Sequence, residues 1–349
     1  MTSGGDGGSY DKEGAAVKPK WIIIAVTALA ISSIFSACTR TDPKPAGPPE
    51  KVTIAYATLT EAALAQVAQT KGYYRDEGLD VTAHLHPYGK LALKEVLEGK
   101  ADFATVAETP LMLAIMNGEK ISVIASILRS QKNHAIVARK DMGIASPQEL
   151  KGRKIGVTFG ITSDFFLDGF LAAHGIPRDK SKVVNLKPDE LQNALVNGDV
   201  EAVSTFYPFL SQTQNKLGDN GITFNDKEIY TETFNVVATQ EFIRKNPDKV
   251  RKMLRALVRA EEFAGNNPAE TQQIVAKFSG IEPGILSSIW ADLNFDLTLN
   301  QSLILVLEDE SRWAIKNGLT SARSIPNYLD FIYIDGLCSV KPGAVRILR

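Results

Sequence analysis

Apolar and polar residues alternate along much of the chain in a way that predicts a repeated order of strand, turn and helix. The segments KVTIAY (51–56) and LDVTAHLH (79–86) alternate at the period of a strand, and apolar residues at helical spacing follow each one. The same order returns in the middle of the chain, where we expect a strand at 154–157 and a helix at 163–174. This repetition predicts an α/β fold with mostly parallel sheets. Beyond residue 238 the chain is predicted to be mostly helical, with helices at 247–264, 268–278 and 302–317.

An apolar segment near the N-terminus, Trp21–Ala37, carries no charge and follows Lys18 and Lys20. A membrane-spanning helix needs about 20 apolar residues, so this slightly shorter run is more typical of a signal peptide. The run ends in FSAC (35–38), which resembles the lipobox of bacterial lipoproteins, although Phe35 stands where leucine is usual. The resemblance implies a signal peptide at 1–37 and lipidation of Cys38. An uncleaved membrane anchor with a chance cysteine is the alternative.

The segment that follows Cys38, TRTDPKPAGPPE (39–50), contains four prolines and a glycine. Such a sequence forms a stiff, extended tether and cannot pack a core. We therefore expect a lipidated cysteine and tether at 38–50 and a folded body from about Lys51 onward. Either reading of the N-terminus places that body outside the cytoplasmic membrane, on the periplasmic side or at the cell surface.

Composition narrows the function further. The 349 residues carry a net charge of −1, and a chain without a basic excess is not expected to bind nucleic acid. The two cysteines suit neither a metal cluster nor a disulfide framework, and Cys338 lies in an apolar segment where a buried free thiol is expected. His84 and His86 share one face of a strand, which a polar surface explains better than half of a metal site. We predict no metal and no cofactor.

Ligands of open α/β sheets sit in the turns after the carboxyl ends of strands, and the turn TFGITSD (158–164) is the most informative of these. Thr162 or Ser163 can cap the helix that follows, and the free N–H groups of a helix start can hold an oxyanion. No Gly-Lys-Ser/Thr sequence follows, so the turn is not a nucleotide-binding P-loop. Plain capping is the alternative to a ligand role, and Asp164 would disfavour an anion if it pointed inward.

The sequence lacks the usual signatures of catalysis. It contains no Gly-x-Ser-x-Gly elbow, and neither cysteine has a histidine evidently placed to activate it. The turns pair no acid with a base, so an enzyme is not predicted. If the chain were an enzyme, Glu108 or His134 would be the titratable residue that turnover requires.

Several segments together resemble the substrate-binding proteins of ABC importers, in the branch that contains the nitrate, taurine, alkanesulfonate and thiamine-precursor-like binders. No segment is decisive alone, but their order and spacing match that family over about residues 51–345. They are GYYRDEGLDVT (72–82), GKADFATVAETPLM (99–112), ELKGRKIGVTFGITSDFFLDGFL (149–171), GDVEAVSTFYP (198–208), RWAIKNGLT (312–320) and PNYLDFIYIDGL (326–337).

The resemblance implies a type II periplasmic-binding-protein fold, with two α/β lobes, a ligand cleft and two crossover segments. Lobe 1 would comprise 51–136 together with 238–349, and lobe 2 would comprise 137–237. The residues that the resemblance carries over as ligand contacts are Thr58, Thr60, Tyr88, Glu108, Thr109, Asn133, Thr158, Ile161, Thr162 and Phe206.

The implied function is that of a monomeric, extracytoplasmic receptor that captures a small polar molecule, anions included, and delivers it to an ABC permease in the membrane. An enzyme on the same fold and a ligand receptor for a membrane sensor are the alternatives. The charge of the ligand stays open. Glu108 would suit an amine or hydroxyl donor and repel a sulfonate, and Arg129 is the only arginine in the contact turns, so no guanidinium clamp for an anion is evident.

Overall fold

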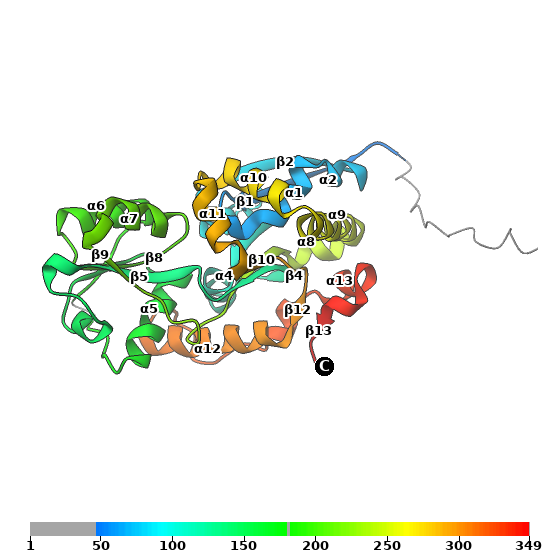
Figure 1. The fold of residues 1–349 in the computed structure, drawn as a ribbon. Helices are drawn as coiled ribbons and strands as arrows, with labels where there is room; N and C mark the ends of the chain where they lie inside the picture. The colour runs from blue at the N-terminus through cyan, green and yellow to red at the C-terminus, as the bar shows by residue number, and fades with distance from the viewer. Residues whose placement is uncertain (1–46, 180–181, 349) are drawn as a thin grey trace, which may run out of the picture. The chain divides into compact units, whose positions relative to one another are not determined.

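The computed structural model describes residues 47–179 and 182–348, which form two mixed sheets with helices packed against both faces of each (Figure 1). The predicted signal peptide, the lipidation site Cys38 and most of the tether lie outside these ranges. Within them, none of the helices is long and apolar enough to cross a membrane.

The first lobe is built on a six-stranded sheet with the order β11-β4-β10-β3-β1-β2. Its strands are β1 (Glu50–Ala57), β2 (Leu79–His86), β3 (Phe103–Ala107), β4 (Ile121–Ser130), β10 (Glu232–Thr239) and β11 (Leu293–Asn294). Its helices are α1 (Ala63–Thr70), α2 (Tyr73–Asp76), α3 (Gly89–Leu97), α4 (Glu108–Met116), α8 (Gln240–Lys245), α9 (Pro247–Asn266), α10 (Pro268–Ser279), α11 (Pro283–Ile289), α12 (Gln301–Asn317) and α13 (Ile334–Val340). The short strands β12 (Leu299–Asn300) and β13 (Val345–Arg346) pair beside it.

The second lobe is built on a five-stranded sheet with the order β7-β6-β8-β5-β9. Its strands are β5 (His134–Arg139), β6 (Ile155–Val157), β7 (Val183–Asn185), β8 (Ala202–Phe206) and β9 (Gly221–Phe224). Helix α5 (Thr162–Ala173) covers one face of this sheet, and α6 (Pro188–Asn197) and α7 (Phe209–Leu217) cover the other. The predicted helices and strands of the body are thus largely confirmed, while α7 and β9 were not predicted.

The expectation of mostly parallel sheets needs a correction. Strands β1 to β4 run in one direction, but β10 lies between β3 and β4 and runs against both. In the second sheet β6, β7 and β8 are parallel, and β5 is antiparallel to both of its neighbours. The reason is the chain path, because β5 and β10 are the strands with which the chain enters each lobe from the other one.

These entry strands also move the lobe boundaries. The predicted boundaries after 136 and 237 are wrong, because β5 (His134–Arg139) lies wholly in the second sheet and β10 (Glu232–Thr239) lies wholly in the first. The crossings are therefore the short segments 131–133 and 225–231. Apolar strands such as HAIVAR fit either core equally well, so periodicity alone does not reveal which sheet a strand joins.

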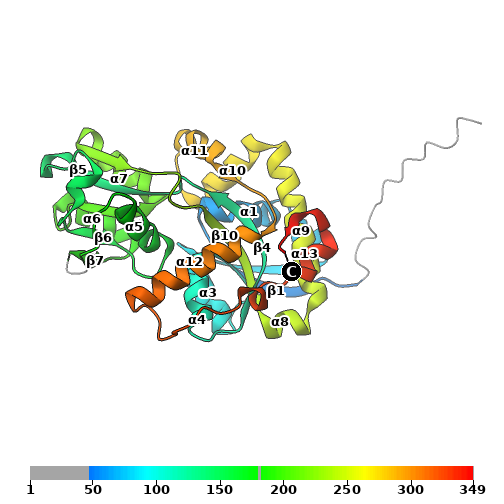
Figure 2. The same ribbon diagram turned by 90° about the horizontal axis from the view of Figure 1, so that it is seen from below.

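The long helix α12 runs alongside both lobes (Figures 1 and 2). It packs on α4 in the first lobe. Toward its end, Trp313 Nε1 donates a 2.5 Å hydrogen bond to Asp168 Oδ2 of α5, and Asn317 Nδ2 donates to the same oxygen at 3.1 Å. Phe165 of α5 stacks edge-on against Trp313, with ring centroids 5.4 Å apart. Helix α12 therefore links the two lobes on one side of the crossings.

Two side chains outside the cleft correct or refine the sequence analysis. Cys338 was expected to be buried but is exposed, because α13 turns Gly336 and Leu337 inward and the next residue faces solvent. His84 and His86 do share a face of β2, where both contact one carboxylate. His84 Nδ1 lies 2.5 Å from Glu95 Oε2, and His86 Nε2 lies 3.2 Å from Glu95 Oε1.

We expect Gly89→Ala to destabilise the first lobe. A Cβ on Gly89 would lie 2.9 Å from the Cα of Val106 and 3.0 Å from the carbonyl oxygen of Thr105, so the start of α3 would have to move away from β3. Overpacking of this kind costs about 1–3 kcal/mol, which urea unfolding would measure. Gly265→Ala is the matched control, because its Cβ meets nothing within 4 Å and alanine favours the helix. Equal stability of G89A and wild type would contradict this packing.

Candidate ligand pocket between the lobes

A pocket of about 340 Å³, partly open to solvent, lies where the two lobes meet. Both lobes supply its walls, and they do so from the ends of strands and the starts of helices. The lining residues of the first lobe are Leu59, Glu61, Tyr88, Gly89, Lys90, Ala107, Pro110, Glu232 and Phe234, and those of the second lobe are His134, Ile161, Thr162 and Phe206. A position between two lobes, at the ends of strands and the starts of helices, is the one expected of a site for a small molecule.

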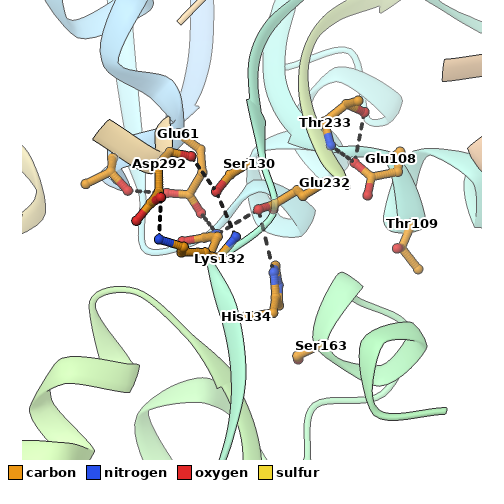
Figure 3. A network of polar contacts seen from close by, with 12 residues as sticks. Glu61, Glu108, Thr109, Ser130, Lys132, His134, Ser163, Glu232, Thr233 and Asp292 are labelled. Carbon is orange, nitrogen blue, oxygen red and sulfur yellow. Dashed lines mark hydrogen bonds and ion pairs between the residues drawn. The ribbon is translucent and has the colours of Figure 1, made fainter. Parts of the chain in front are cut away.

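Asn133 bridges Glu61 and Glu232 by hydrogen bonds at the polar end of the pocket, and Figure 3 shows where these two glutamates lie beside Lys132 and His134. The Asn133 side-chain nitrogen donates to Glu61 Oε1 and to Glu232 Oε2, at 2.8 Å in both cases. Glu61 also accepts a 2.7 Å bond from the hydroxyl of its neighbour Thr60. The side chains are nearly inaccessible, with exposed fractions of 1% for Glu61 and 2% for Glu232 and Asn133. The first crossing thus fixes two carboxyl groups in one buried site.

Burial controls the charge of this polar end. It raises the pKa of the Glu61 carboxyl, and burial together with repulsion from Glu61 and Glu108 raises the pKa of Glu232 well above its usual value. The imidazole of His134 lies 3.6 Å from Glu232 Oε2, too far for a hydrogen bond. Burial lowers the pKa of His134 to about 3, so this histidine is neutral and does not balance the carboxyl groups.

A second pair of buried glutamates lies beside the pocket without lining it. Glu108 Oε2 accepts bonds from the N–H (2.9 Å) and the hydroxyl (3.0 Å) of Thr233. Glu310 of α12 accepts a bond from the hydroxyl of Thr109. Burial raises the pKa of Glu108 to about 8, and burial together with the nearby Glu108 carboxyl raises that of Glu310 well above its usual value. Four glutamates are therefore buried within and around one end of the cleft.

Lys90 also lines the pocket and reaches across the cleft. Its ammonium donates a 3.2 Å hydrogen bond to the carbonyl oxygen of Phe159 in the second lobe, and desolvation of this ammonium lowers its pKa although the residue as a whole is exposed. Gly160 makes this approach possible. It has φ of +69°, and a Cβ there would lie 3.2 Å from Lys90 Nζ and 3.3 Å from Leu113 Cδ1. Any side chain at position 160 would be strained and would crowd the lysine.

The turn at 158–164 differs from its prediction in one respect. The cap residue of α5 is Ile161, and neither Thr162 nor Ser163 caps the helix, because both already lie inside it. The Thr162 and Ser163 hydroxyls are buried, and neither has a hydrogen-bond partner in the described part of the chain. Asp164 closes the turn, accepting from the Gly160 N–H at 3.1 Å and from Arg178 at 2.7 Å. The Asp164 carboxylate is therefore hydrogen-bonded within the protein, and Thr162 lines the pocket.

The ten predicted contacts fall into three groups. The first group lines the pocket: Tyr88, Ile161, Thr162 and Phe206. The second group lies behind the lining: Thr60, Glu108, Thr109 and Asn133. Three of them donate hydrogen bonds to buried glutamates, and Glu108 is itself a buried glutamate. The third group does not line the pocket and bonds to the main chain. Thr58 donates to the carbonyl of His86, and Thr158 donates to that of Leu186. A ligand role for these ten residues stays a prediction.

Two polar lining residues, Glu61 and Glu232, were missed, and neither Lys90 nor His134 was predicted to line the site. Glu61 and Lys90 each lie four residues after the carboxyl end of a strand, β1 or β2, and this position was the available signal. Glu232 and His134 lie at the amino ends of the entry strands β10 and β5. The rule about carboxyl ends of strands does not select such positions.

Aromatic side chains form much of the remaining lining of the pocket. His134 and Phe206 face each other with ring centroids 5.7 Å apart, and His134 also lies 6.0 Å from Phe166. Phe234 and Tyr88 complete the lining from the first lobe. The pocket therefore combines apolar walls with a few polar groups, which is the usual composition of a specific small-molecule site.

Two α/β lobes that are joined by two crossings and meet at a polar pocket define the periplasmic-binding-protein-like fold. The periplasmic aliphatic sulphonate binding protein SsuA of Escherichia coli has the same fold, with a TM-score of 0.70 and 16% identity over 82% of this chain and 98% of that one. The model of the NMT1/THI5-like family matches residues 60–271. The chain belongs to this family.

Two curated relatives show the range of functions among similar sequences. The taurine-binding periplasmic protein of Escherichia coli is 25% identical over 245 residues, which cover 67% of this chain and 74% of that protein. A 4-amino-5-hydroxymethyl-2-methylpyrimidine phosphate synthase of Saccharomyces cerevisiae is 27% identical over 218 residues, or 58% of this chain and 63% of the synthase.

The stability of the ligand-free protein should fall as pH rises from about 5 to about 9. The Glu108 carboxyl binds its proton more tightly in the folded state, with a pKa of about 8 against an ordinary value of 4.5. Its stabilising contribution is therefore complete below about pH 4.5 and is lost as pH rises through about 8. Glu108→Gln removes this charge and retains an acceptor for Thr233. The melting temperature of E108Q should decline less steeply with pH, and parallel curves for both proteins would count against a buried, protonated Glu108.

Proposed function

We propose that the protein is a solute-binding receptor that captures a small polar molecule between its two lobes and delivers it to an ABC importer. The observation that carries the proposal is the composition of the pocket, whose polar and aromatic walls come from both lobes. A ligand there would touch Glu61 and Lys90 on one side and Thr162 and Phe206 on the other. The family membership and the taurine-binding relative support the same function.

A ligand in such a pocket favours the arrangement in which both lobes contact it. Only contacts made in the closed arrangement shift that equilibrium, and a micromolar affinity corresponds to roughly −8 kcal/mol in total. The two lobes already meet through Lys90 and Phe159 and through Trp313 and Asp168. These direct contacts would lower the cost of closure, while the ligand supplies the remaining free energy.

We also propose that the body is held outside the cytoplasmic membrane by a lipid on Cys38. The N-terminal signal pattern and the periplasmic location of the taurine-binding relative support this placement. A tether of a dozen residues would keep the receptor at a high local concentration near its permease. Residues 38–50 would then act as a spacer and not as part of the binding site.

An enzyme remains the second candidate, because one relative is a synthase and because His134 and Glu232 lie 3.6 Å apart in the pocket wall. A general base must reach the proton that it removes, and both residues line the pocket. The two candidates differ in what becomes of the ligand. A receptor returns its ligand unchanged, whereas an enzyme converts it.

A screen of thermal unfolding against small anions, sulfonates, carboxylates, amines and pyrimidines should give a class of stabilising compounds. A ligand at about a hundred times its dissociation constant adds roughly 2.7 kcal/mol, which raises the melting temperature by a few degrees in a chain of this size. Phe206→Ala should reduce the shift by removing an aromatic wall, while the exposed Leu329→Ala should not.

Chemical analysis of the stabilising compound after incubation separates the two functions. Recovery of the unchanged compound supports the receptor. Its conversion, abolished in His134→Gln or Glu232→Gln, would replace the receptor with an enzyme.

Replacement of Cys38 by alanine should release the protein from membranes. A lipid chain on this cysteine is the proposed attachment, and a single substitution removes it. Fractionation of cells that express the full chain would find wild type with the membranes and C38A in the soluble fraction. Cys38 and Cys338 are the only cysteines, so C338A is the matched control and should fractionate as wild type. C38A that still sediments with membranes would show that the apolar segment is an uncleaved anchor.

A further inference from the structure

The charges around the pocket are out of balance. In the described part of the chain, no lysine or arginine forms an ion pair with Glu61 or Glu232. The basic side chain within ion-pairing distance of Glu232 is His134, which is neutral. Lys132, next to the bridging Asn133, pairs instead with Asp292, at 2.5 Å between Nζ and Oδ1. The Lys90 ammonium is engaged by the Phe159 carbonyl. Two buried carboxyl groups in a ligand pocket therefore lack a positive partner from the protein.

Unsatisfied hydrogen-bonding groups occur in the same place. Thr162 lines the pocket with an exposed fraction of 3%, and its hydroxyl has no partner among the described residues. The buried side-chain oxygen of Asn133 likewise finds no partner within residues 47–179 and 182–348. Buried polar groups are nearly always paired in native structures. A molecule that enters the pocket is the natural source of the missing partners.

The geometry suits a group with several N–H donors. Glu61 Oε1 and Glu232 Oε2 each lie 2.8 Å from the same Asn133 nitrogen, so the greatest separation possible for them is twice that distance, 5.6 Å. One ammonium or amidinium group can donate to two acceptors at this spacing. The rings of Phe206, Phe234 and Tyr88 line the same pocket, and aromatic faces attract a cation within about 6 Å.

We infer that the receptor proposed above binds its ligand through a protonated nitrogen with at least two N–H donors, an ammonium or an amidinium, held between Glu61 and Glu232. The inference rests on the proposed function and names the ligand class for that pocket. Once ionised, the carboxylate pair accepts hydrogen bonds and repels anions, so a sulfonate or nitrate alone does not fit this end of the pocket when the pair is charged. Lys90 and Thr162, which line the same pocket, leave a place for an acceptor group on the same molecule, so the class includes zwitterions.

The pH dependence of binding follows from the groups that face the site. Glu232 on β10 faces Glu61 after β1, His134 on β5, Glu108 on α4 and Glu310 on α12, while Lys90 on α3 lies across the pocket. Because burial favours protonated carboxyl groups in the empty pocket, a cation must displace protons to bind. The affinity for a cationic probe should therefore rise with pH below the pKa of the probe, whereas the affinity for a purely anionic probe should fall.

The test is a titration calorimetry series on the full chain with matched probes: propylamine, acetamidine, propanesulfonate and 3-aminopropanesulfonate. The three nitrogen probes share the proposed group, and propanesulfonate lacks it. We expect binding of at least one nitrogen probe, stronger at about pH 8 than at about pH 6 and accompanied by proton release. Propanesulfonate should bind at least about tenfold more weakly than 3-aminopropanesulfonate, since a hydrogen-bonded charge contributes about 1.5–3 kcal/mol.

Three variants locate the contact. Glu232→Gln and Glu61→Gln should each weaken the bound nitrogen probe about tenfold or more, because each removes one negative acceptor. Glu77→Gln is the matched control, since it removes a partly buried carboxyl that neither lines the pocket nor acts on Glu232, and it should keep the affinity within about threefold. Melting curves check that each variant folds, and if E232Q does not, E61Q gives the same test from the other side of the bridge.

Three outcomes overturn the inference. Binding of propanesulfonate with no gain from the added amine would do so, as would unchanged affinity in both E61Q and E232Q. Failure of every nitrogen probe to bind at about 10 mM would overturn it too, because even millimolar affinity corresponds to only about −4 kcal/mol. None of these outcomes removes the receptor function, which is judged by the wider screen. Chemical conversion of a bound probe would instead overturn the receptor function itself.

Discussion

The amide of Asn133 holds the pocket together, because one nitrogen bridges a carboxyl from each of two distant segments at the point where the chain leaves the first lobe. Without that bridge, Glu61 and Glu232 would be two buried acids with no shared partner, and burying unpaired carboxyl groups is costly. The bridge satisfies one acceptor on each acid and cancels no charge. The site is therefore well ordered and still lacks a positive partner, a combination that a ligand can exploit.

The topology explains why these groups meet. Strands β3 and β8 end at the cleft, bringing Ala107 and Phe206 to it, whereas the entry strands β5 and β10 begin there, bringing His134 and Glu232. Helix α12 then adds Glu310 beside the cleft and bonds to Asp168 of the second lobe through Trp313. The crossings therefore connect the lobes and also deliver part of the chemistry of the pocket.

Much of the fold was predictable from the sequence, because periodicity marks buried faces and glycine marks turns. The boundaries of β1 and β2 were predicted to within one residue. Periodicity does not tell which sheet a strand joins, and this is why the lobe boundaries at β5 and β10 were wrong. Periodicity also does not tell whether a polar side chain points into the pocket or lies behind its lining. Glu108 was therefore predicted to contact the ligand, whereas Glu232 is the glutamate that lines the pocket. Such distinctions depend on pairing between residues far apart in sequence, for example Asn235 with Val106.

A crystal structure of the complex with a stabilising ligand would test the central claim most directly. The account predicts a ligand in contact with both lobes, with a nitrogen within hydrogen-bonding distance of the Glu61 and Glu232 carboxyl groups and Thr162 supplying a contact from the second lobe. A ligand bound elsewhere, for example in the groove lined by Arg178, Trp313 and Asn317, would contradict it. So would an anionic group seated between the two glutamates.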